Sequence, residues 1–181
     1  MSILTTILIL LTAIIVIILI AAALLPDTYT IERETIINQP KQQVFNYIKI
    51  LNNQQYFNKW VMADLQMRKT FTGTDGAVGF IYAWDSDNKQ VGKGEQEIKA
   101  IADGEQVDSE VRFMKPFEGK LLASFITTAT TPGQTRVRWI INGQRNFMMR
   151  VFHLLFNLRK TLGKDMVISM DNLKNLMERA N

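Results

Sequence analysis

The sequence contains no cysteine and only one histidine, His153. Without cysteine there is no disulfide, no thiol nucleophile and no cysteine-ligated metal. A single histidine leaves a Ser-His-Asp triad or a histidine-rich metal site almost nothing to build on. His153 lies among apolar residues, where we expect a structural role. We therefore expect neither a metal nor a cofactor, and we assign no catalytic residue.

Charge is missing from the first stretch of the chain. The 23 residues from Ile3 to Leu25 carry no charged side chain, and Pro26-Asp27 ends the run. A helix rises about 1.5 Å per residue, so the run would reach roughly 34 Å, enough to cross a hydrocarbon core of ~30 Å. The sequence predicts a transmembrane anchor over residues 1–26 of a single-pass membrane protein.

Two other interpretations of this run stay open. Ala21-Ala22-Ala23 offers the small residues of a signal-peptide cleavage site, although no Lys or Arg precedes the run and the run is long for a signal core. A buried core helix fits less well, because the run is apolar on every face. Arg33 is the only basic residue among the first 40, which favours a soluble domain on the non-cytoplasmic side.

Residues 27–181 are long enough for one domain with a single core. Their charge is uneven: residues 27–133 hold 12 Lys and Arg against 14 Asp and Glu, and residues 134–181 hold 9 against 3. The basic character belongs to the last quarter of the chain, so we expect no general nucleic-acid surface and no nucleic-acid partner.

Alternating strands separated by turn signals make up most of this domain. A strand is predicted at Thr28–Asn38, two short helices follow Pro40, and six further strands are predicted between residues 67 and 142. In the last strand Val137, Trp139 and Ile141 oppose Arg136 and Arg138. Such alternation indicates an antiparallel sheet with one covered and one wet face.

The cover is expected from the C-terminus. Apolar residues recur there at three- and four-residue steps, namely Leu158, Leu162, Met166, Met170, Leu173 and Met177. This spacing predicts a long amphipathic helix over residues 159–179, with Gly163 as a local weak point. The fold class is therefore α+β, with a seven-stranded antiparallel sheet around a long C-terminal helix.

This order resembles the helix-grip fold of the START-related superfamily (SRPBCC proteins). Tyr29 to Phe45, with its strand, proline and helix, is similar to the opening of that family, and the stretches Val78–Trp84 and Val91–Glu95 resemble its bacterial polyketide cyclase/dehydrase-like branch. The resemblance covers about residues 28–178. It implies a cavity between sheet and last helix, and members that range from lipid carriers to cyclases and ligand sensors.

The polar residues that could take part in catalysis are expected on the wet face of the sheet or in turns. Glu95 and Glu97 share one face of a strand, but Gly92, Gly94, Gln96 and Ile98 form the more apolar face, so the glutamates are expected to face water. Asp108, Glu110 and Arg112 are read as a solvated strand face. The glycine-rich run from Gly73 to Gly79 leads into a strand and is read as a turn rather than a phosphate loop.

Seven residues are predicted to line a ligand cavity. They are Phe80, Tyr82, Trp84, Val111, Trp139, Met166 and Met170. The residues alone favour an ordinary filled core, whereas the resemblance favours a cavity. The expected function is a membrane-anchored binding domain for a lipid or other apolar small molecule, with Tyr82, Ser109 or Gln96 orienting a polar end. The alternative is an enzyme of polyketide cyclase/dehydrase type in the same cavity. No protein partner is indicated.

The stretch from Asn146 to Lys164 mixes basic and bulky apolar residues. That mixture suits a segment seated at an anionic membrane interface, which would act as a lid. It also suits a cap on the core whose arginines reach water.

Overall fold

The computed structural model describes residues 2–116, 118–156 and 158–179. In chain order its elements are α1 (Ile3–Leu24), β1 (Thr28–Ile37), α2 (Lys41–Ile48), the 3₁₀ helix η1 (Leu51–Tyr56), α3 (Lys59–Met62), β2 (Arg68–Thr72), β3 (Ile81–Asp85), β4 (Lys93–Ala102), β5 (Gln106–Lys115), β6 (Gly119–Thr131), β7 (Gln134–Gln144), α4 (Phe147–Phe156) and α5 (Leu158–Arg179).

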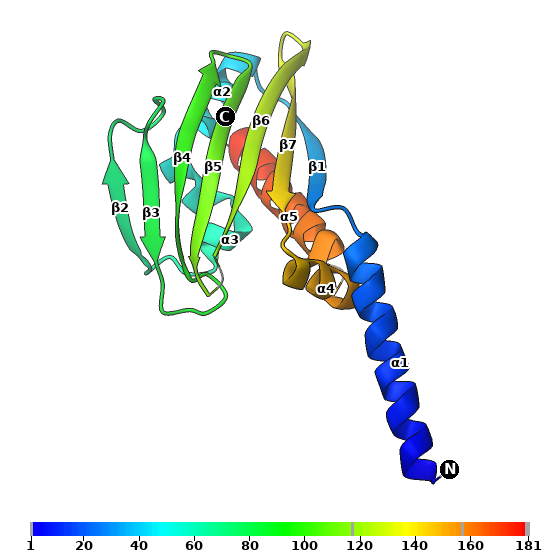
Figure 1. The fold of residues 1–181 in the computed structure, drawn as a ribbon. Helices are drawn as coiled ribbons and strands as arrows, with labels where there is room; N and C mark the ends of the chain where they lie inside the picture. The colour runs from blue at the N-terminus through cyan, green and yellow to red at the C-terminus, as the bar shows by residue number, and fades with distance from the viewer. Residues whose placement is uncertain (1, 117, 157, 180–181) are drawn as a thin grey trace.

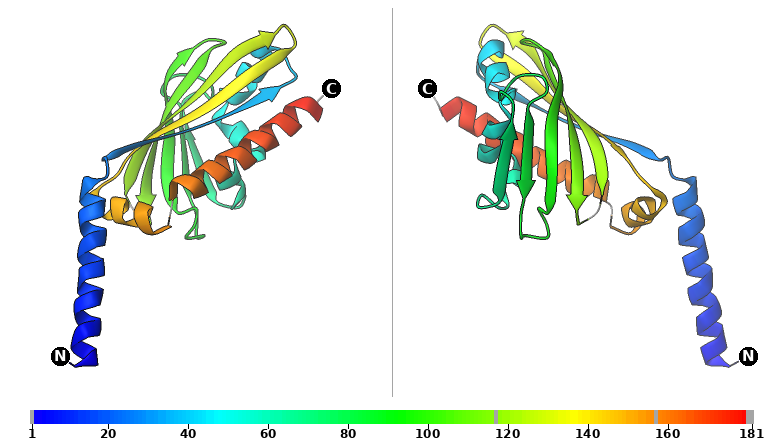
Figure 2. Two further views of the ribbon diagram at one scale, coloured as in Figure 1. Left: turned by 90° about the vertical axis from the view of Figure 1, so that its right-hand side faces the viewer. Right: turned by 60° about the vertical axis from the view of Figure 1, so that its left-hand side comes forward.

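The seven strands form one antiparallel sheet in the order β1-β7-β6-β5-β4-β3-β2. Consecutive strands are neighbours from β2 to β7, and β1 pairs with β7 and forms the edge of the sheet opposite β2. The sheet curves around α5, and the short helices α2 and α3 lie on the same side as α5 (Figures 1 and 2). The predicted fold class is confirmed.

The strand alternation separates a buried face from a wet face. In β7 Val137, Trp139 and Ile141 are buried, whereas Arg136 and Arg138 point outward and approach Glu34 and Glu32 of β1. The apolar side of α5 closes the inner face, because its spacing of three and four residues brings one stripe toward the sheet. That stripe consists of Met166, Met170, Leu173 and Met177, all under 5% exposed.

Gly163 has a packing role that its helix position did not suggest. Arg33 of β1 points inward, and its guanidinium occupies the space that a Cβ at position 163 would need. The missing side chain therefore lets β1 and α5 approach with a charged side chain between them.

The outer face carries the acidic residues, as predicted. Arg112 donates hydrogen bonds to Glu95 Oε1 at 2.7 Å, Glu97 Oε2 at 2.8 Å and Glu110 Oε1 at 2.7 Å. The bond from Arg112 is the main cause that lowers the pKa of Glu110 below its usual value. These carboxylates are engaged with a cation on the wet side of the sheet, so they do not serve an interior site.

Three details differ from the sequence prediction. Between β1 and β2 the chain forms three short helical segments instead of two. β3 begins later than expected, so Val78 lies in the preceding loop and is 61% exposed. In the same loop the Asp75 carboxylate accepts hydrogen bonds from the backbone N–H groups of Leu51 and Asn52, at 2.8 and 3.0 Å, and so caps η1. The run from Gly73 is thus a turn, as predicted.

The third difference is α4, a separate helix between β7 and α5 that the sequence did not resolve. The side chains of His153, Phe156 and Leu158 lie outside the described residues, so the structural role predicted for His153 remains a prediction.

The first helix, α1, extends away from the domain (Figures 1 and 2). Its 22 residues are long and apolar enough to cross a membrane, and Ala22 is the one buried residue described in it. The rest of its surface is aliphatic, from Ile3 at 82% exposure to Leu24 at 81%. At its C-terminal end it packs against α4.

Candidate ligand-binding cavity

A cavity of about 290 Å³ lies between the inner face of the sheet and the helices α3 and α5. Strands β3 to β7 each contribute side chains, which alternate inward along each strand. The described lining residues are Gln54, Asn58, Trp60, Val61, Met67, Tyr82, Trp84, Gln90, Val91, Gln96, Val111, Phe113, Leu121, Ala123, Phe125, Trp139, Ile141 and Leu162. Most of them are apolar or aromatic, as in small-molecule pockets generally.

Four of the seven predicted site residues are brought together in this lining: Tyr82, Trp84, Val111 and Trp139. The other three are in closely packed core. Phe80 is 3% exposed and packs with Phe45 and Ile98 under β3 and β4, and Met166 and Met170 are at most 1% exposed, with β1 and β7 above them. For the two methionines the reason is that α5 lies close to β1, so neighbouring side chains fill the space.

The lining residues that the sequence analysis missed include a group from α3 and the chain before it, namely Gln54, Asn58, Trp60 and Val61. Trp60 closes one side of the cavity, with its ring edge against Trp139 at 5.6 Å between centroids. Its indole N–H donates to Asp165 Oδ2 of α5 at 3.1 Å, and Lys59 pairs with the same carboxylate. The side chain of the N-cap residue Asn58 accepts a hydrogen bond from the backbone N–H of Trp60, and an asparagine at this place is the sequence signal that could have located the start of α3.

Trp84 forms the opposite wall and needs a glycine beside it. A Cβ at Gly94 would lie 2.6 Å from Trp84 Cζ2, so only glycine lets the indole lie over β4. The Trp84 N–H donates to the carbonyl of Val91 at 3.3 Å, which ties the β3–β4 loop to this wall. The loop residues Gln90 and Val91 thereby become part of the lining.

The polar groups inside the cavity fall into two kinds. Gln96 donates to Ser109 Oγ at 2.8 Å, and Ser109 donates to the carbonyl of Ala123 at 3.3 Å, so this chain is satisfied within the protein. By contrast, the Tyr82 hydroxyl and the Trp139 indole N–H are buried and hydrogen-bonded to no described protein group. Such atoms normally have a partner.

Burial raises the pKa of Tyr82 to about 12, so its hydroxyl keeps its proton near neutral pH and can donate. Tyr82 is the only titratable residue in the described lining. Among the described residues no group of three or more His, Cys, Asp or Glu is placed to hold a metal ion. The described lining can bury apolar surface and includes two residues with unpaired donors, and none of its side chains is an acid or base that titrates near neutrality.

No family model and no curated protein matches the sequence. Solved structures do match. Norcoclaurine synthase from Thalictrum flavum, in complex with dopamine and hydroxybenzaldehyde, aligns with a TM-score of 0.64 at 10% identity, over 90% of this chain and 92% of that one. Protein MLL2253 from Mesorhizobium loti aligns at 0.62 and 17%, over 84% and 99%.

The Aha1 dimer from Colwellia psychrerythraea aligns at 0.58 and 12%, over 83% and 96%. At these identities the likeness is one of fold. With its curved seven-stranded sheet and long C-terminal helix, the chain has the helix-grip fold.

Proposed function

We propose that this protein is a membrane-anchored binding domain for a small, uncharged, apolar molecule that carries a hydrogen-bond acceptor. One observation carries the proposal: the cavity of about 290 Å³ is lined mainly by apolar side chains, and two of the lining residues, Tyr82 and Trp139, have buried donors without a partner among the described residues.

The volume of the cavity limits the size of the ligand. Pockets for small molecules span roughly 300–1,000 Å³, so 290 Å³ is at the low end. A single acyl chain or a molecule with one or two rings fits such a volume. A lipid with two acyl chains would have to leave one chain outside. We therefore narrow the expected ligand to one chain or a small ring system.

The lining of the cavity favours an uncharged ligand. Burying an ionised carboxylate or ammonium without a counter-charge is strongly unfavourable, and the described lining residues include no Lys, Arg, Asp or Glu. A carbonyl, ester or ether oxygen, in contrast, would accept from the Tyr82 hydroxyl or the Trp139 N–H. A neutral ketone, aldehyde, alcohol or ester is therefore favoured over a free acid.

Binding is favoured over catalysis in this cavity. The solved synthase of the same fold, from Thalictrum flavum, holds dopamine and hydroxybenzaldehyde, which supports a small-molecule site in this architecture. An acid–base enzyme needs a group whose pKa lies near the working pH. Tyr82, at about 12, is far from it. The cyclase-type alternative would therefore have to obtain its acid or base from the substrate or another chain.

The anchor in this proposal is α1, with the domain on the non-cytoplasmic side, because residues 27–40, which follow the helix in the sequence, contain Arg33 as their single basic residue. Only Leu25, Pro26 and Asp27 separate α1 from β1, so the domain is held directly at the surface. Protease digestion of sealed, right-side-out vesicles would test on which side of the membrane the domain lies. Protection of the domain from the protease would contradict the non-cytoplasmic side.

The experiment uses the full chain in phosphatidylcholine nanodiscs and a photoactivatable single-chain fatty methyl ester with a diazirine on its chain. After irradiation, peptide mass spectrometry locates the label. We expect label on cavity peptides from β5 and β7 as well as on α1. The variant Val111→Trp, which places an indole in the cavity, should remove the cavity label and leave the α1 label as an internal control.

Two comparisons sharpen this test. The corresponding free acid should label the cavity less than the ester. Tyr82→Phe keeps the ring and removes one donor, and Trp139→Phe keeps an aromatic side chain but removes the indole N–H together with its five-membered ring. Since a neutral hydrogen bond is worth about 0.5–1.5 kcal/mol, each should weaken ester binding by roughly 2- to 12-fold. Label confined to α1 in the wild type, or cavity label that survives in folded Val111→Trp, would contradict the binding function.

A further inference from the structure

Several of the loops and element ends that line the cavity lie at the end of the domain toward which α1 projects. Among the lining residues, Gln90 and Val91 come from the β3–β4 loop, Phe113 and Leu121 flank the β5–β6 turn, and Leu162 is in the first turns of α5. Figures 1 and 2 show these loops, α4 and the start of α5 gathered at the end of the sheet toward which α1 projects.

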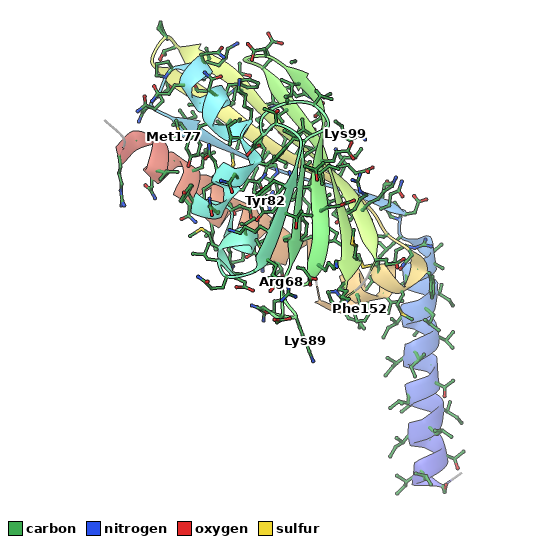
Figure 3. The ribbon with its side chains drawn as sticks, turned by 90° about the vertical axis from the view of Figure 1, so that its left-hand side faces the viewer. Arg68, Tyr82, Lys89, Lys99, Phe152 and Met177 are labelled. Atoms are coloured by element: carbon green, nitrogen blue, oxygen red, sulfur yellow. The ribbon has the colours of Figure 1, made fainter. Side chains whose placement is uncertain are left out.

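The side-chain view gives the same arrangement. Figure 3 places Lys89 and Arg68 at this end of the sheet, Met177 toward the opposite end, and Tyr82 between them on the strands. In every view α4 lies beside the last turns of α1. The direction of α1 therefore defines which end of the domain faces the bilayer.

Contacts within the protein fix α4 to the end of α1. The Arg150 guanidinium donates to the carbonyls of Leu25 at 3.0 Å and Ala23 at 3.4 Å, which are among the carbonyls that the end of a helix leaves unpaired. The Arg145 N–H donates to the carbonyl of Asp27 at 2.6 Å. Arg150 thus bonds to the end of α1, and Arg145 bonds to the residue before β1. These bonds restrict rotation of the domain relative to α1.

The surface of α4 is apolar to an extent unusual for protein in water. Phe147, Met148, Leu154 and Leu155 are between 42% and 61% exposed, and Met114 near the end of β5 is 42% exposed. Contiguous exposed apolar residues of this size mark a contact surface. Their position beside α1 leaves a natural occupant, because a bilayer that contains α1 reaches the level of α4.

The charge around α4 is of one sign. Residues 145–164 contain no Asp or Glu and five basic residues, which are Arg145, Arg150, Arg159, Lys160 and Lys164. Arg159 and Lys164 are exposed on the first turns of α5, next to α4. A helix with an apolar side and neighbouring cations is the type that lies in the interface of a membrane with anionic lipids.

We propose that α4, together with the near ends of β5 and α5, rests on the anionic surface of the bilayer that contains α1, and that the cavity opens onto this bilayer. The inference rests on the proposed anchoring by α1. Its consequence for function is direct: an apolar ligand passes between the bilayer and the cavity without crossing water, which would otherwise limit the exchange of an insoluble molecule.

The lack of cysteine makes a depth measurement straightforward, since a single introduced cysteine takes a fluorophore at one position only. The variants Met148→Cys and Leu155→Cys report on α4. Ile9→Cys, within α1, is the embedded control. Val78→Cys is the matched exposed control, because Val78 is 61% exposed in the β2–β3 loop at the opposite end of the sheet. Each full-length variant is placed in nanodiscs whose lipids carry a spin-label quencher near the headgroup or deep in the acyl chains.

The expected pattern is quenching of Met148→Cys and Leu155→Cys by the shallow quencher, quenching of Ile9→Cys by the deep one, and no quenching of Val78→Cys. If the α4 labels are as unquenched as the Val78 label while Ile9→Cys is quenched, the surface proposal is wrong and the anchor stands. If Ile9→Cys is also unquenched, the anchoring in the proposed function is itself wrong.

The charge is tested by lipid composition. Adding phosphatidylserine to phosphatidylcholine nanodiscs should increase the quenching at Leu155→Cys. The added variant Arg159→Gln/Lys164→Gln should lose that increase. A matched pair at the far end of the domain, Lys41→Gln/Lys49→Gln on and next to α2, should retain it. Equal quenching in both lipids for the wild-type charges would overturn the anionic preference.

Discussion

A substitution that fills the cavity tests whether free space is present between the sheet and the helices. Ala123 of β6 is 5% exposed, faces the cavity, and lies opposite Ser109 of β5 and Ile141 of β7 in the strand register. The substitution Ala123→Leu adds three carbon atoms at this position. In a filled core they would have no room, whereas in a cavity of about 290 Å³ they do.

The change in the free energy of unfolding caused by Ala123→Leu has opposite signs for a cavity and for a filled core. Burial of each additional carbon contributes about 0.8 kcal/mol, so three contribute up to about 2.4 kcal/mol. Overpacking a filled core instead costs about 1–3 kcal/mol. At about 24 cal/mol per Å³, a dry cavity of 290 Å³ would correspond to at most on the order of 7 kcal/mol. The gain expected from Ala123→Leu is therefore well within what the cavity leaves available.

The assay is thermal unfolding of the full chain in nanodiscs, followed by tryptophan fluorescence. For a protein of this size about 1 kcal/mol moves Tm by roughly 2–4 °C, so Ala123→Leu should raise Tm by about 5–10 °C and reduce labelling by the ester. The control is Ala129→Leu, on the exposed end of the same strand, which should leave both unchanged. A lower Tm with unchanged labelling would refute the assignment of the cavity.

Three further predictions concern residues around the site. Gly163→Ala should be neutral or destabilising in the wild type, because its Cβ meets the Arg33 guanidinium, yet stabilise an Arg33→Ala background by about 1 kcal/mol in denaturant unfolding, since alanine favours the helix. The lowered pKa of Glu110 gives stability that is present above its ordinary pKa and lost as pH falls through the folded value. Arg112→Met should therefore flatten the loss of Tm between about pH 5 and 3. The pKa of Tyr82, raised to about 12, gives stability that is lost as pH rises from its ordinary value toward 12, so Tm of Tyr82→Phe should fall less above about pH 10.

The elements that the sequence predicted well are those with a strict period. In β7 the alternation of Trp139 with Arg138 defines a face at every second residue, and in α5 the steps from Met166 to Met177 define one stripe. These patterns depend on backbone geometry alone, so they can be read before any tertiary contact is known. The turns also follow from local chemistry, as Gly73 and Gly76 show with their positive φ angles of 86° and 81°.

The division of the inner face between core and cavity could not be predicted in this way. Met170 and Tyr82 both point inward, and both are apolar enough for either place; the distance between sheet and helix at each position decides. That distance depends on contacts such as the ring of Trp60 held by Asp165, which joins segments more than 100 residues apart. The helix α4 escaped prediction because several of its apolar side chains, such as Met148 and Leu155, are exposed instead of packed in the core, so they give no buried stripe that a core-facing helix would show.

The short tether has a consequence for transport. Three extended residues span at most about 10 Å, and Arg145 and Arg150 already bond across the connection between α1 and β1. A shuttle that loads at one membrane and unloads at another must either detach or have a linker of many tens of residues. With α1 embedded as we propose, this domain would do neither. Under that proposal the exchange of ligand is confined to a single leaflet, where the domain would extract a molecule, shield it, or present it to a neighbour that diffuses past.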